Sequence, residues 1–155
     1  MSDKELRQYL VSMLTEPNAH LTIDEAVRSI PPQTRGILFD GYGHTAWQIL
    51  EHLRIAQWDI MEFSRDASHI SPKFPDGYWP TEAAPPDEKS WAESVKRFQS
   101  ELKQMCDLIS DESNDLFAGI PHGDGQTLLR EALVLAKHNS YHIGQLAMLK
   151  YAVSK

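Results

Sequence analysis

The sequence predicts an all-α fold, a four-helix bundle of up-down-down-up topology with a long crossover between the second and third helices. Two observations carry this expectation. Apolar residues recur at intervals of three and four along four long segments, the spacing of a buried helix face. No segment alternates apolar and polar residues as a strand would, and clusters of proline and glycine separate the periodic segments. Four helices in one small chain favour a bundle.

The first long helix is expected over residues 3–15 and ends before Pro17. The positions expected on its buried face are Leu6, Tyr9, Leu10 and Met13. A short helical element should follow, capped by Thr22 or Asp24 and reaching about Ser29. Residues 33–42 give no clear pattern.

The second long helix is expected from Gly43 to about Arg65, with a wide apolar stripe. Residues 67–86 then break the pattern, because they contain five prolines and one glycine. A loop of this length is uncommon and is usually functional or a crossover between the ends of a bundle. Such a crossover allows the second and third helices to run parallel.

Asp87 is the expected N-cap of the third helix. Its apolar stripe advances by four and three through Trp91, Val95, Phe98, Leu102, Met105 and Ile109. Thr127 or Asp124 can cap the fourth helix, which should run to about Val153.

Composition limits the classes of function. We expect residues 1–155 to form one domain, since the chain is too short for two ordinary enzyme domains. A net charge of −7 without a basic cluster argues against nucleic-acid binding. We expect a cytoplasmic protein without membrane contact, because no signal peptide or spanning segment is evident. The one cysteine, Cys106, excludes an intrachain disulfide and a cysteine-based zinc knuckle.

The most informative motif is the pair His138 and His142 in KHNSYHIGQL. Residues four apart on a helix project from one face, so both imidazoles can bind one metal ion. Both histidines share a stripe with Leu135 and Leu149, which predicts that they face inward. Two buried imidazoles would otherwise need separate hydrogen-bond partners. The alternative is a pair of ordinary core or surface histidines.

A catalytic metal site usually takes three protein ligands, so a third must come from another helix. His52 is the natural choice, because it lies mid-helix beside the core stripe and near the small Ala56. A boundary histidine bonded to a neighbour is the alternative. His44 can be a capping residue about two turns away, and His122 lies too far along the chain. His20 and His69 are expected in solvated loops.

Several neighbouring residues allow two interpretations. Gln145 can orient a ligand or be an ordinary surface glutamine. Asp59 lies seven residues after His52 and can be a pocket acid, although a solvated charge is favoured. Tyr78 and Trp79 can form a wall over the metal, although loop anchors are favoured. Gly144, in a helix interior, indicates a close backbone or ligand.

The segment HNSYH lacks the glutamate of HExxH proteases, so that peptidase mechanism is disfavoured. Three neutral histidines would leave the full ionic charge on open positions, which suits activation of a thiol or a water. A fourth protein ligand, for instance His44 or Asp59, would instead favour a structural metal. Imidazole suits several transition metals, so the residues alone do not select one.

The segments HTAWQILEHLRIAQW, IPHGDGQTLLREALVLAK and HNSYHIGQL together resemble the DinB-like superfamily, which includes the YfiT-type metal-dependent hydrolases. The resemblance covers most of the chain from about His44 to Lys150. It implies an up-down-down-up bundle in which His52, His138 and His142 hold a metal ion, commonly nickel or zinc. It also implies homodimers, and transferases that use low-molecular-weight thiols.

The leading hypothesis is therefore a metal-dependent enzyme, a thiol transferase or a hydrolase, acting on a small-molecule substrate. No residue is assigned as catalytic. The alternative is a non-enzymatic helical bundle with a structural metal or a ligand-binding role. These two classes differ in the number of side chains that would close around the ion.

Overall fold

The computed structural model describes residues 3–153 and is all-helical over that range, as expected. Four helices are long. These are α1 (Asp3–Thr15), α3 (Ala46–Arg65), α4 (Glu88–Ser110) and α5 (Leu128–Val153). The shorter elements are α2 (Ile23–Arg28) and the two 3₁₀ turns η1 (Pro32–Thr34) and η2 (Asp76–Tyr78). Among the described residues, no helix is long and apolar enough to cross a membrane.

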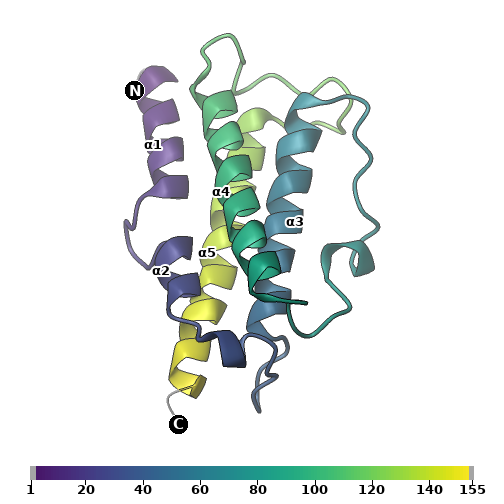
Figure 1. The fold of residues 1–155 in the computed structure, drawn as a ribbon. Helices are drawn as coiled ribbons and strands as arrows, with labels where there is room; N and C mark the ends of the chain where they lie inside the picture. Colours follow the sequence, from purple (N-terminus) through teal and green to yellow (C-terminus); the bar gives the residue numbers. More distant parts are fainter. Residues whose placement is uncertain (1–2, 154–155) are drawn as a thin grey trace.

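The long helices lie side by side, as Figure 1 shows. Helices α3 and α4 run in the same direction, and α1 and α5 run in the opposite direction. The segment between α3 and α4, residues 66–87, returns alongside α3 and carries η2. We call this segment the crossover loop. The crossover loop therefore places residues that follow the end of α3 beside the middle of the same helix.

Side-chain caps set the starts of the helices. Asp87 accepts a hydrogen bond from the Ser90 amide at 2.7 Å, which confirms it as the N-cap of α4. The Thr127 hydroxyl accepts from the Arg130 amide at 3.1 Å, so Thr127 rather than Asp124 precedes α5. Helix α3 begins at Ala46 and not at Gly43.

The later start of α3 has a local cause. Thr45 forms a capping box with Gln48, in which each side chain accepts a hydrogen bond from the other residue's backbone amide. A capping box fixes the first residue of a helix, so the chain before Thr45 stays irregular. Thr22 forms the equivalent box with Glu25 at the start of α2.

The buried face of α1 was predicted correctly at two of its four positions, Leu6 and Leu10, and wrongly at the other two. Tyr9 and Met13 are more than half exposed, while Arg7 is buried. The Arg7 guanidinium donates to the backbone carbonyls of Ile109 and Asp111 at the end of α4, at 2.6 and 3.0 Å. The Ile109 carbonyl lies in the last turn of α4, where carbonyls lack a partner within the helix. This long-range cap therefore helps to determine which face of α1 is buried. The spacing of apolar residues gives no sign of it.

Two apolar clusters form the core. One lies near the start of α3 and includes Leu50, Phe98 and Leu146, and the other lies near its end and includes Met61 and Met105. The expected stripe of α4 is confirmed, since all six of its residues are buried or pack against these clusters.

A polar level separates the two clusters. Gln57 is fully buried on α3, and its amide donates to the Phe98 carbonyl at 2.7 Å. The Asn139 amide on α5 donates to the Gln57 side-chain oxygen at 3.1 Å. His52 and His138 come from the same region of the two helices.

Candidate metal centre

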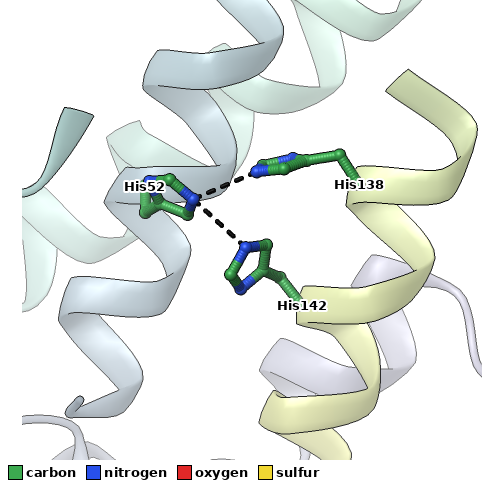
Figure 2. A group of neighbouring side chains, drawn as sticks. All are labelled: His52, His138 and His142. Atoms are coloured by element: carbon green, nitrogen blue, oxygen red, sulfur yellow. Dashed lines mark hydrogen bonds between the residues drawn. The ribbon is translucent and has the colours of Figure 1, made fainter. Parts of the chain in front are cut away.

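Three histidines from two helices converge at one point, as Figure 2 shows. His52 comes from α3, and His138 and His142 come from α5. The Nε2 atom of His52 lies 3.0 Å from that of His138 and 3.1 Å from that of His142. One ligand atom from each residue lies within 4.8 Å of the others. We call these three residues the histidine cluster.

The outer nitrogens of two rings are held by oxygen acceptors. The Nδ1–H of His52 donates to the Tyr78 carbonyl at 2.9 Å, and that of His142 donates to the Gln145 side-chain oxygen at 2.7 Å. A carbonyl oxygen can only accept, so each neutral ring carries its proton on Nδ1 and a lone pair on Nε2. These two lone pairs point at each other across 3.1 Å.

His138 does not complete the hydrogen bonding of the cluster. Its Nδ1 atom is buried and has no hydrogen-bond partner. If the His138 ring carries its proton on Nε2, this N–H can donate to Nε2 of His52. The Nε2 lone pair of His142 then still faces the Nε2 lone pair of His52. A cation among the three Nε2 atoms would be bound by all of these lone pairs. Three neutral imidazoles are a ligand set typical of transition metals, so the residues fit such an ion.

Burial keeps the cluster neutral. Loss of solvent, with a smaller contribution from neighbouring histidines, lowers the pKa of both His52 and His138 to about 4. Loss of solvent also lowers the pKa of His142. All three rings are therefore uncharged at neutral pH, and a histidine must be in this form to bind a metal.

The crossover loop covers His52. The Trp79 ring stacks on the His52 ring with their centroids 3.8 Å apart and their planes 1° from parallel. The His44 ring also stacks on Trp79, with a centroid distance of 3.8 Å. Trp79 thus forms a wall beside the cluster, whereas the Tyr78 side chain anchors the loop to α3, which is the interpretation that the sequence favoured.

The family model of the DinB superfamily matches residues 8–146. The chain belongs to the DinB superfamily. No curated protein and no solved structure matches the chain significantly. The resemblance inferred from the sequence is confirmed at the level of the family.

Among the described residues of this DinB-superfamily chain, no further histidine, cysteine or carboxylate joins the cluster. Within residues 3–153, the three histidines are the only group of histidine, cysteine or carboxylate side chains close enough to hold one ion. His44 and Asp59 are both outside that group. An ion held by these three side chains alone would have open positions, which is the arrangement typical of catalytic metal sites.

Two residues that we expected in solvent are buried. Asp59 is only 8% exposed, and its carboxylate accepts from the His69 ring at 2.8 Å and from the Tyr78 hydroxyl at 2.6 Å. The His69 side chain is 7% exposed. Burial and then the bond to Asp59 raise the pKa of Tyr78, so its hydroxyl stays protonated. The sequence placed His69 in a loop correctly but gave no sign that the loop folds back onto α3.

The remaining histidines lie outside the cluster. His122 is exposed, and its ring bonds to the Phe63 carbonyl at 2.6 Å, near the end of α3. His20 is also exposed and bonds to the Ser140 hydroxyl at 2.9 Å. His44 does not cap α3, because Thr45 does.

A groove of about 630 Å³ is lined by Gln145, the hydrogen-bond partner of His142, but by none of the three clustered histidines. It runs between the chain around Gly43 and the outer side of α5, and its lining includes Gln145, Tyr141 and Met148. Gly144 lines it too, and no atom lies within 4 Å of where its Cβ would be. Our expectation of a close backbone at Gly144 was therefore wrong.

Proposed function

We propose that the protein is a metal-dependent enzyme in which His52, His138 and His142 hold one divalent ion. One observation carries this proposal. The Nε2 atoms of His52 and His142 approach to 3.1 Å while oxygen acceptors hold both protons on the opposite ring nitrogens. Such a contact between two lone pairs is repulsive unless a cation is shared. Nickel and zinc are the ions that we expect first.

The donor set supports activation of a thiol or a water. Three neutral imidazoles leave the full charge of a divalent ion on its open positions, where it lowers the pKa of a bound thiol or water. The protein's own residues orient and shield this centre. Tyr78 and Gln145 fix the ring orientations of His52 and His142, and Trp79 excludes water from one face of His52.

The residues next to the cluster favour one class of reaction over the other. A hydrolase of the HExxH type needs a carboxylate beside its metal, and Asn139 occupies that position here. A thiol can become a nucleophile by losing its proton to solvent once its pKa is lowered. We therefore favour thiol transfer over hydrolysis, with a low-molecular-weight thiol as co-substrate. The groove lined by Gln145 and His44 is the place that we propose for a small-molecule acceptor.

We further propose that the four long helices form a single up-down-down-up bundle spanning residues 1–155. The directions of α1, α3, α4 and α5 in Figure 1 support this topology, and the crossover loop supplies the long connection that it requires. A bundle places side chains from facing helices in its core, which is how α3 and α5 would contribute the ligands.

The test of function is a thiol-dependence assay. Protein loaded with nickel or zinc is incubated with an electrophilic acceptor and a panel of low-molecular-weight thiols, with and without a chelator. We expect consumption of the acceptor that needs both thiol and metal and that is lost in His142→Ala. Acceptor turnover without thiol would support the hydrolase instead. No turnover with either nucleophile would support the non-enzymatic alternative.

A further inference from the structure

We propose that Asp59 is a positioning residue for the metal ligand His52 and acts on it through Tyr78. The inference rests on the proposed metal site. Asp59 is not itself a ligand, because it follows His52 by seven residues, about two helical turns. Its effect is instead transmitted by the crossover loop, which Asp59 fastens to α3.

Both oxygens of the Asp59 carboxylate bind the loop. One accepts from Nε2–H of His69 at 2.8 Å, and the other accepts from the Tyr78 hydroxyl at 2.6 Å. The His69 and Asp59 side chains are only 7% and 12% exposed, so water competes little for these bonds. His69 also packs edge-on against Trp58 of α3, with ring centroids 4.9 Å apart. The start and the middle of the loop are thus held by one carboxylate.

Tyr78 connects this fastening point to the metal ligand. Its hydroxyl donates to Asp59, and its backbone carbonyl accepts from Nδ1–H of His52 at 2.9 Å. The next residue, Trp79, stacks on the same imidazole. The placement of the Tyr78 backbone therefore sets both the tautomer and the ring plane of His52, which together aim its Nε2 lone pair at His138 and His142.

Removal of the Asp59 carboxylate should loosen the attachment of the crossover loop to α3. In Asp59→Asn one carboxylate oxygen becomes an amide nitrogen that cannot accept, so the Tyr78 hydroxyl and the His69 ring can no longer both be bound. The Tyr78 carbonyl would then be held beside His52 only by the bond from the His52 ring itself, and the loop would keep its bond from the Thr45 hydroxyl to the Ala83 carbonyl at the cap of α3. Groups that orient a metal-bound histidine typically change metal affinity by roughly 10- to 100-fold. By linkage, a metal on His52 should in turn hold the loop in place.

The matched control is Glu62→Gln. Glu62 is also on α3 and also accepts two hydrogen bonds, but both come from Arg65 and neither involves the crossover loop. This variant removes one carboxylate from the same helix, as Asp59→Asn does. It therefore separates loss of a charge from loss of the link to Tyr78.

The experiment measures Co²⁺ affinity by competition with a chelator, together with the visible ligand-field spectrum of the bound ion. We expect Asp59→Asn to weaken Co²⁺ binding by roughly 10- to 100-fold and to change the spectrum. Tyr78→Phe, which keeps the carbonyl, should have a smaller effect in the same direction. The double variant should be no weaker than Asp59→Asn alone, because both act on one link. Glu62→Gln should match the wild type.

A second readout does not depend on metal. Lys73 is the one lysine or arginine within residues 66–87, and it is exposed, so trypsin cleavage there reports release of the loop. Cleavage of metal-free Asp59→Asn should be faster than that of the metal-free wild type. Equal cleavage rates, or an unchanged Co²⁺ affinity and spectrum, would overturn the role of Asp59. A wild type that binds no Co²⁺, Ni²⁺ or Zn²⁺ would instead overturn the proposed function.

Discussion

Helix α5 and the crossover loop both contact the histidine cluster, but they do so in different ways. Helix α5 presents His138 and His142 from consecutive turns of one regular element. The loop places Tyr78 and Trp79 against His52 only after an excursion of more than ten residues from the end of α3. The first arrangement is encoded by spacing along the chain, and the second depends on contacts between distant residues.

This difference separates the ligands from the groups that orient them. On the α5 side, the orienting group Gln145 lies one turn from His142 in the same helix. On the loop side, the corresponding group is a backbone carbonyl, whose position depends on the Asp59 link. The α5 side should therefore tolerate changes elsewhere in the molecule, whereas the loop side should respond to them.

The largest effect that we expect concerns pH, because both sides contribute to burial of the cluster. The pKa of His52 and His138 is about 4 in the folded chain and about 6.5 when unfolded. Between these values the unfolded chain binds more protons, so the free energy of unfolding of metal-free protein falls as pH falls. From pH 7 to pH 5, each histidine should lower the folding constant by roughly tenfold or more. Urea unfolding with a chelator present measures this.

Substitutions sharpen the pH test. His138→Gln should make the pH dependence shallower, because one buried histidine no longer gains a proton on unfolding. His20→Gln should keep the wild-type dependence, since His20 is exposed and outside the cluster. If His138→Gln and the wild type lose stability equally between pH 7 and pH 5, the burial that we assign to the cluster does not control its protonation.

The next effect compares the two orienting groups directly. Gln145→Met keeps the size of the side chain but removes the acceptor for Nδ1–H of His142. We expect Zn²⁺ affinity to fall by roughly 10- to 100-fold, as for Asp59→Asn on the loop side. Gln99→Met is the control, because exposed Gln99 loses a bond to Asp24 and contacts none of the three histidines through it. Wild-type Zn²⁺ affinity in Gln145→Met would mean that only the loop side orients its histidine.

Much of the fold could be predicted because it follows local rules. The all-α class, the bounds of α1 and the Asp87 cap each depend on residues close in sequence. The bringing together of His52, His138 and His142 was also predicted, since helical spacing indicated that all three face the core. Their role as ligands stays a prediction.

The misses share a physical cause. Asp59 and His69 were expected in solvent because charged and loop residues usually are, yet their side chains are paired and largely shielded from solvent. Arg7 faces inward because it caps a helix more than one hundred residues away. Such polar pairs form only where the fold brings distant segments of the chain together. Hydrophobic periodicity contains no information about these contacts.

The central claim is that one ion is bound by three histidines, and metal analysis of protein purified without an affinity tag tests it most directly. His52→Ala and His138→Ala are compared with the wild type and with His122→Ala, which removes a histidine outside the cluster. We expect close to one transition-metal ion per chain in the wild type and His122→Ala, and a large loss in the other two. Equal metal content in all four proteins would contradict the site.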